Sequence, residues 1–287
     1  MKYNLAFKYR IYPNKEQELL INKTFGCVRF VYNTILYTAN KIYEETGKNK
    51  IITPASLKSE NQFLKEVDSP ALSNTQLNVK RSFTNFFQKR AKFPKFKSKK
   101  TSVKSYTTNC VNNSIRIEEN KYLVLPKLKK IKLKYHREIP KDYRIKSVTL
   151  TNSNGNYYVS VLTEFEKEIQ KMPSNDKVIG FDFSMSELFV SSENQRADYP
   201  KYFRMLEEKL KKLQKSLSRK VKFSKNWYKQ KAKISKLHEH IKNCRRDFLH
   251  KLSKKLSKEH NAVIVENLNM KGMSQALNFG KSVGDNG

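Results

Sequence analysis

The sequence of 287 residues is long enough for one large domain or two ordinary ones, each with its own hydrophobic core. Its 59 Lys and Arg residues outnumber 26 Asp and Glu residues, and the net charge of +33 requires a polyanionic partner to offset its self-repulsion. The chain has neither an apolar run near the roughly 20 residues of a transmembrane helix nor a signal-peptide core, so we expect a cytoplasmic nucleic-acid-binding protein without a membrane partner.

The first half of the chain alternates between strand and helix periodicity. Apolar side chains at every second position predict a strand from Tyr3 to Ile11. Spacing of three and four residues predicts helices over Glu16 to Glu45 and Leu72 to Arg90, joined by a polar connector from Gly47 to Ser59. We interpret residues 15–92, approximately, as a helical insertion.

A period of two then returns in four short segments. They are Ile115 to Ile117, Tyr122 to Leu125, Ile145 to Leu150 and Tyr157 to Phe165. The turn Asn152 to Asn156 contains Asn-Gly and makes the last two strands a hairpin. Together with the first strand, these segments predict a small β-barrel that the helical insertion interrupts, ending near residue 172.

A polar linker from Met172 to Asp176 precedes the second half. An apolar strand from Val178 to Phe183 carries one acid and has a predicted partner strand from Leu188 to Ser191. Two long helices, with leucines and isoleucines spaced three and four apart, predict an antiparallel hairpin whose outer faces are strongly basic. A buried strand follows, from Ala262 to Glu266.

Asp182 and Glu266 each lie in or at the end of an apolar strand, where burial is costly without a cation or hydrogen-bond partners. Nucleases of the RNase H type place such acids on adjacent strands to hold two Mg²⁺ ions, and that centre generally needs three or more carboxylates. The alternative is that each acid caps a following turn, Asp182 near Ser184 and Glu266 near Asn267 to Asn269. The cysteines Cys27, Cys110 and Cys244 form no CxxC pair, so we expect half-buried thiols and no metal site.

Six short motifs lie in order along nearly the whole chain. They are Ile11 to Asn14, Gly26 to Asn33, Phe93 to Lys97 with Ser105-Tyr106, Gly180 to Asp182, Arg246 to Leu252, and Val265 to Met273. The set resembles the TnpB family, transposon-encoded RNA-guided nucleases ancestral to type V CRISPR effectors. The resemblance implies an α+β fold. Residues 1–172 would form a wedge-type β-barrel with a helical recognition insertion, and residues 173–287 a truncated RuvC-like (RNase H-like) α/β domain with a basic helical hairpin.

Departures from the family pattern concern the acids. Beyond the segment that Ser282 to Gly287 resembles, family members hold a CxxC…CxxC zinc knuckle and a third catalytic Asp. Ser184 also replaces the last Gly of the first RuvC motif. We therefore expect Asp182 and Glu266 to be remnants of a site that no longer cleaves, since loss of one such carboxylate usually removes most activity. Asp285 is the only nearby candidate for the missing ligand.

This pattern resembles the nuclease-dead, TnpB-like repressors. The resemblance implies a guide-RNA partner and a double-stranded DNA target, with base pairing reading most of the target and the protein reading a short adjacent motif. The ribonucleoprotein would occupy a promoter of the bacterial nucleoid and block RNA polymerase, and Mg²⁺ would be needed only if cleavage remains. Two interpretations stay open: an active Mg²⁺-dependent TnpB-type endonuclease, and a guide-independent nucleic-acid-binding accessory protein.

The resemblance places adjacent-motif readers on the helix from Ser69 to Asn78 and on the segment from Tyr106 to Asn113. Side chains there that could contact base edges are Asn74, Gln76, Asn78, Thr107, Thr108 and Asn112. Guide-RNA phosphates are expected at Lys8, Arg10, Lys92, Lys95, Lys97, Lys99 and Lys100. An Asn in a turn is more often a backbone cap, and any single Lys more often only solvated. Collectively the cations predict a steep salt dependence of binding, and a protein that is poorly soluble without its RNA.

Overall fold

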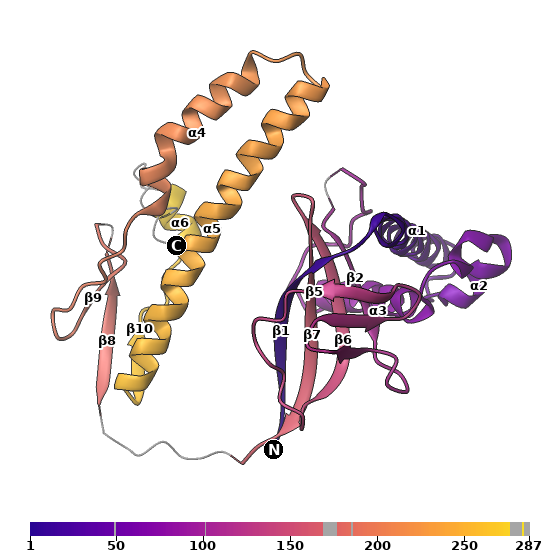
Figure 1. Ribbon diagram of the computed structural model, residues 1–287, viewed down its shortest axis with the longest axis horizontal. Coiled ribbons are helices and arrows are strands. Elements are labelled where there is room, and N and C mark those ends of the chain that lie inside the picture. Colours follow the sequence, from indigo (N-terminus) through magenta and orange to yellow (C-terminus); the bar gives the residue numbers. More distant parts are fainter. Residues whose placement is uncertain (49, 101, 169–176, 185, 276–282, 284–287) are drawn as a thin grey trace. The chain divides into compact units, whose positions relative to one another are not determined.

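The computed structural model describes residues 1–287 except 49, 101, 169–176, 185, 276–282 and 284–287 (Figure 1). The chain forms two compact units, Met1–Ile169 (unit 1) and Gln170–Gly287 (unit 2). The predicted linker from Met172 to Asp176, the predicted boundary after residue 172, and Asp285 all lie outside the described residues.

Unit 1 contains one antiparallel sheet of seven strands. The strands are β1 (Lys2–Tyr12), β2 (Lys104–Asn109), β3 (Arg116–Glu118), β4 (Tyr122–Leu125), β5 (Lys129–Leu133), β6 (Arg144–Ser153) and β7 (Asn156–Glu166). Their order is β2-β6-β7-β1-β5-β4-β3. Among the described strands, β2 and β3 do not pair with each other, so the predicted barrel is not closed. The helix α3 (Ser69–Phe87) contacts β2, and β3 has only three residues with which to form a closing ladder.

The hairpin of β6 and β7 confirms the turn prediction. Ser153 pairs with Asn156, which leaves Asn154 and Gly155 as a two-residue loop. Both have positive φ, 51° and 82°, as the mirror-image hairpin turn requires. Asn tolerates that conformation better than most residues, and Gly adopts it without steric cost.

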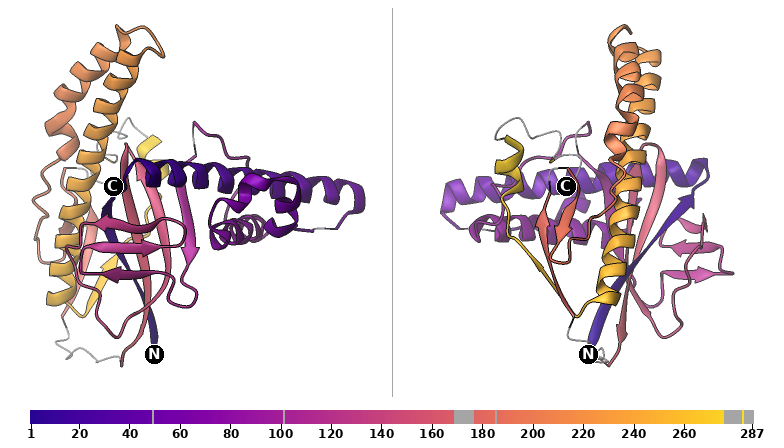
Figure 2. Two further views of the ribbon diagram at one scale, coloured as in Figure 1. Left: turned by 45° about the vertical axis from the view of Figure 1, so that its right-hand side comes forward. Right: turned by 90° about the vertical axis from the view of Figure 1, so that its left-hand side faces the viewer.

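The helix α1 (Lys15–Thr46) connects two cores of unit 1 (Figure 2). It begins with a capping box, in which the Asn14 and Gln17 side chains each accept the other residue's backbone N–H. In its first half Ile21 and Phe25 join the core over the sheet. In its second half Ile35 and neighbouring residues pack with α3 in a helical core. The long helix therefore fixes the helical insertion to the sheet.

The polar connector predicted from Gly47 to Ser59 carries helical structure that its sequence did not signal. It contains α2 (Pro54–Glu60), followed by a short 3₁₀ helix (Gln62–Lys65). Pro54 suits a first helical position, because proline there leaves no intrahelical hydrogen bond unmade. Leu57 and Leu64 anchor these turns in the helical core. Such short, weakly periodic helices are stabilised by tertiary packing rather than by propensity.

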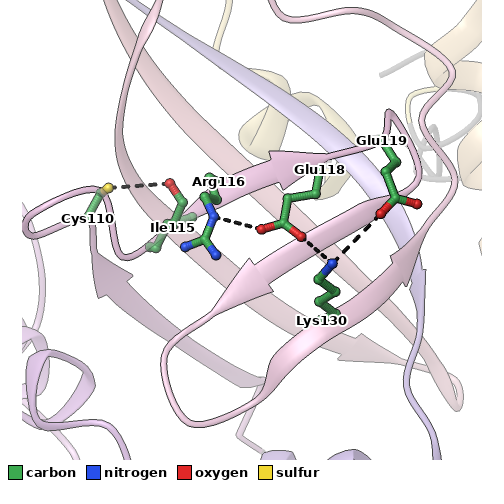
Figure 3. Close-up of polar contacts among 6 residues, drawn as sticks. All are labelled: Cys110, Ile115, Arg116, Glu118, Glu119 and Lys130. Atoms are coloured by element: carbon green, nitrogen blue, oxygen red, sulfur yellow. Dashed lines mark hydrogen bonds and ion pairs between the residues drawn. The ribbon is translucent and has the colours of Figure 1, made fainter.

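The strands β3, β4 and β5 form a meander with an ion cluster on its surface (Figure 3). Glu118 accepts from Arg116 Nε at 2.8 Å and lies 2.6 Å from Lys130 Nζ, while Glu119 lies 3.8 Å from the same ammonium. The Lys130 hydrogen bond lowers the pKa of Glu118 below its usual value. Because these side chains reach solvent, the cluster neutralises local charge and stabilises the meander only weakly.

Unit 2 combines a small sheet with a helical hairpin. The strands β8 (Val178–Phe183), β9 (Phe189–Ser191) and β10 (Ala262–Val265) have the order β10-β8-β9, with β10 parallel to β8. The helices α4 (Tyr202–Ser218) and α5 (Lys225–Glu259) pack through Leu210, Leu237 and Ile241, as the spacing predicts, and a short α6 (Met270–Gln275) follows. In the described chain, no helix combines the length and apolar character that crossing a bilayer requires.

The strand β10 was predicted to be buried, and this is wrong. Val263, Ile264 and Val265 are 43%, 62% and 67% exposed. As an edge strand β10 pairs only with β8, so one of its sides carries no ladder hydrogen bonds.

Candidate functional site

Two strands of unit 2 carry one acid each at neighbouring positions. In the parallel pair, Val265 of β10 lies opposite Phe181 of β8. Asp182 is the next residue of β8, and Glu266 directly follows β10. Both acids line one hollow of about 390 Å³. Since parallel strands keep their register, the two carboxylates come from the same level of the sheet.

Both carboxylates are exposed, so the expectation that their burial demands a cation is wrong. They lie at the rim of a three-stranded sheet, where water can solvate the charge. The turns that follow are capped by other side chains: Ser184 and Asn269 each accept the backbone N–H three residues later, at 3.2 and 3.0 Å. Within the described residues, neither the Asp182 nor the Glu266 carboxylate has a hydrogen bond or ion pair. The capping alternative is therefore not supported.

The pair can supply oxygen ligands of the kind that Mg²⁺ prefers. Across residues 1–275 and 283, apart from the positions that the structure omits, no three His, Cys, Asp or Glu side chains lie close enough to hold an ion. Among these residues Asp182 and Glu266 alone therefore do not complete a metal site.

The predicted motif-reading residues fall into two groups. Asn74 of α3 donates from its side-chain amide to the Thr107 carbonyl at 3.1 Å and to Asn109 Oδ1 at 3.2 Å. Thr107 shares a hydrogen bond of 2.8 Å with Thr149, and Thr108 is 2% exposed and donates to Asp68. These three side chains already have protein partners: Asn74 joins α3 to β2, Thr108 joins β2 to the residue before α3, and Thr107 joins β2 to β6.

The other three motif candidates are more accessible. Gln76 is half-buried, whereas Asn78 and Asn112 are exposed. Asn112 has a positive φ of 47°, which suits a turn. The structure therefore leaves Gln76, Asn78 and Asn112 available for base-edge contacts, on α3 and in the loop after β2.

The predicted phosphate contacts on β1 lie on the exposed face of the sheet. Lys8 Nζ is 4.8 Å from the centre of the Tyr158 ring, and the Arg10 guanidinium is 5.2 Å from that of Tyr12. Arg10 also donates to Asn156 Oδ1 at 2.7 Å. These aromatic and amide partners on β1 and β7 orient two cations without neutralising them. The alternating pattern of β1 indicated the cations, but their partners across the sheet could not be read from it.

The remaining predicted contacts lie in the segment between α3 and β2. Lys92, Lys95, Lys97, Lys99 and Lys100 are all exposed there. Lys97 differs from the others because its ammonium lies 4.0 Å from the centre of the Tyr32 ring, and partial desolvation of that end lowers its pKa although the residue as a whole is exposed. Desolvation disfavours the charged form, and an approaching anion would restore it.

The three cysteines are free. Cys110 and Cys244 are half-buried as predicted, Cys110 lying 3.5 Å from the Ile115 carbonyl (Figure 3). Cys27 is instead fully buried in the helical core of unit 1, where burial raises its pKa.

Comparison with known proteins gives two kinds of match. A family profile described as "Probable transposase" matches residues 160–277, and one described as "Helix-turn-helix domain" matches residues 1–48. The chain is 34% identical over 285 residues to "Putative RNA-guided DNA endonuclease InsQ" of Escherichia coli (strain K12), covering 96% of this chain and 69% of that protein. It is 32% identical over 289 residues to "Putative RNA-guided DNA endonuclease" of Streptomyces pristinaespiralis, covering 98% and 71%.

Among solved structures, the chain resembles a protein chain in "Cryo-EM structure of the Cas12f1-sgRNA-target DNA complex". The TM-score is 0.59 at 12% sequence identity, covering 99% of this chain and 86% of the other. At that identity the likeness concerns the fold. The sequence matches extend over nearly the whole chain, and they establish that the chain belongs to the TnpB family.

Proposed function

We propose that this protein binds a guide RNA and uses it to select a double-stranded DNA site. The observation that carries the proposal is the similarity, over 96% and 98% of the chain, to relatives named as RNA-guided DNA endonucleases. The net charge of +33 and the oriented cations of β1 support it, because an RNA scaffold and a DNA target are both polyanions.

The two units would have different roles in this function. Unit 1 acts as the wedge and recognition part, with the cations of β1 and of residues 92–100 on guide-RNA phosphates. Gln76, Asn78 and Asn112 are the accessible candidates for reading the adjacent motif. Unit 2 acts as the RuvC-like part, a role supported by its parallel pair of acid-bearing strands. Such a complex would act on the bacterial nucleoid.

We further propose that the bound complex does not cut, and that it represses transcription by occupying a promoter against RNA polymerase. The support is local. Asp182 and Glu266 are exposed, and nothing in the described part of the chain fixes their side chains, whereas a cleaving centre needs rigidly held ligands. Ser184 also stands where the family motif has Gly.

An active endonuclease is the second candidate. It is favoured by the names of the relatives and by the register that brings Asp182 and Glu266 to one hollow. In that case Mg²⁺ would be a required cofactor, and a further ligand would complete the site.

The test uses the ribonucleoprotein purified with its copurifying RNA, a matching DNA duplex, and Mg²⁺. Binding without a cut strand supports the repressor. Cutting that Asp182→Ala abolishes supports the endonuclease and refutes the repressor. Binding that RNase pretreatment leaves unchanged refutes RNA guidance and indicates an accessory protein. For the repressor, Glu266→Ala should keep the wild-type affinity for the target, and a tenfold loss would contradict its description as a remnant.

A further inference from the structure

A small pocket of unit 1 is lined by cationic and hydroxyl side chains. It lies between α1 and residues 97–100 and 102–105, which we call the strap. The lining residues are Phe25, Val28, Arg29, Lys97, Lys99, Ser102, Val103, Lys104 and Ser105. Four of them are cationic, two carry hydroxyl groups and none is acidic. The pocket has a volume of about 30 Å³.

One face of α1 builds this pocket. Phe25, Arg29 and Asn33 are spaced four residues apart, so their side chains leave the helix on the same side. The Asn33 amide donates to the Lys97 carbonyl at 3.0 Å and accepts from the Lys97 N–H at 2.8 Å. The Tyr32 ring lies under the Lys97 ammonium. These contacts fix the start of the strap against α1, one helical turn from Arg29.

No ion pair within the described part of the chain neutralises the cations of the pocket. Arg29 is half-buried, and within the described residues its guanidinium has no hydrogen bond or ion pair. No Asp or Glu occurs in the sequence between Asp68 and Glu118, a stretch that includes the whole strap. Asp68 itself accepts from Thr108. A guanidinium removed from water without a partner is costly, and a bound anion would offset that cost.

We propose that this pocket binds one phosphate group of a nucleic-acid backbone. The Arg29 guanidinium offers a planar fork of donors, the strap lysines add charge, and Ser102 and Ser105 add hydroxyl donors. The pocket is too small for a nucleoside, so the contact fixes position without reading sequence. The inference rests on the proposed function only in requiring a nucleic acid as the source of the phosphate.

The test measures binding of the full chain to two fluorescent probes, a single-stranded RNA and a DNA duplex, across a salt series. Arg29→Gln is compared with Arg81→Gln, which removes an exposed arginine of α3 without a partner in the described chain. Loss of one hydrogen-bonded phosphate contact should lower affinity about tenfold. It should reduce the salt slope by about 0.7 for the RNA or about 0.9 for the duplex, and Arg29→Lys should restore much of the slope.

The outcomes separate the possibilities. A loss of affinity confined to the RNA probe identifies a guide-RNA phosphate as the ligand. A loss of affinity confined to the duplex identifies a DNA phosphate. Equal affinities and salt slopes of the Arg29 and Arg81 variants with both probes would refute the proposal that the pocket binds a phosphate. If Arg29→Gln proves unstable, Lys104→Gln, at an exposed position, serves in its place. A wild-type protein that binds RNA but never directs DNA binding would refute the proposed function and leave this test valid.

Discussion

The two hydrogen bonds between the Asn33 side chain and the Lys97 backbone, which we call the clamp, can be removed without changing a core residue. Asn33→Leu keeps a side chain of similar size and removes both hydrogen bonds to the Lys97 peptide. At about 0.5 to 1.5 kcal/mol each, the two bonds contribute about 1 to 3 kcal/mol to holding the strap closed. That range corresponds to a roughly 5- to 150-fold rise in the population of the open strap.

Hydrogen exchange measured by mass spectrometry on peptides covering residues 95–105 reports this opening directly. Asn40→Leu is the matched control, because Asn40 is a half-buried residue of α1 whose side-chain amide has no hydrogen bond in the described chain. The global unfolding midpoint should stay constant, since the buried neighbours Ile35 and Leu36 are untouched. Unchanged exchange in Asn33→Leu, or an equal rise in the control, would refute the role of the clamp.

Three further predictions concern stability and reactivity. Phe83→Ala should cost about 3 to 5 kcal/mol of unfolding free energy because Phe83 is 7% exposed, whereas Phe87→Ala, at a side chain 65% exposed, should cost less than about 1 kcal/mol; urea unfolding followed by tyrosine circular dichroism measures both. Leu237→Ala should destabilise the helical hairpin of unit 2 by about 2 to 5 kcal/mol, which the fluorescence of Trp227, the only tryptophan, reports. Cys27 should be alkylated last of the three cysteines at pH 8, because its raised pKa keeps it a thiol where only thiolate reacts; peptide mass spectrometry gives the order, and an early reaction of Cys27 would contradict its burial.

Hydrophobic periodicity predicted the elements that carry their own local signal. The helix α1 has apolar residues on a consistent face and a capping Asn14, so its predicted and observed bounds differ by one residue at each end. The loop Asn154-Gly155 permits one tight hairpin geometry, which the structure adopts. The relation of Asp182 to Glu266 came from the family motifs, because spacing along the chain does not say which strands pair.

Features that depend on distant partners could not be predicted from the sequence. The apolar run of β10 suits a buried strand as well as an exposed edge strand, and only the sheet order distinguishes them. Thr108 carries a hydroxyl of the kind that reads base edges, but this hydroxyl donates to Asp68, forty residues away, and the side chain is buried. Asn33 and Lys97 are 64 residues apart, and nothing in the sequence around either residue predicts their contact.

The exposure of Asp182 and Glu266 changes what their mutation can reveal. A buried acid stabilised by partners contributes to folding as well as to catalysis. A loss of activity on its removal can therefore result from unfolding rather than from the missing catalytic group. These two acids have no such partners in the described chain, and their turns are capped by Ser184 and Asn269. Removing either carboxylate therefore takes away no contact on which the described fold depends. Any difference between wild type and Asp182→Ala in a cleavage assay then reports on the chemistry of the hollow itself. A cleavage assay of these two proteins can therefore distinguish the repressor from the endonuclease without a confounding loss of structure.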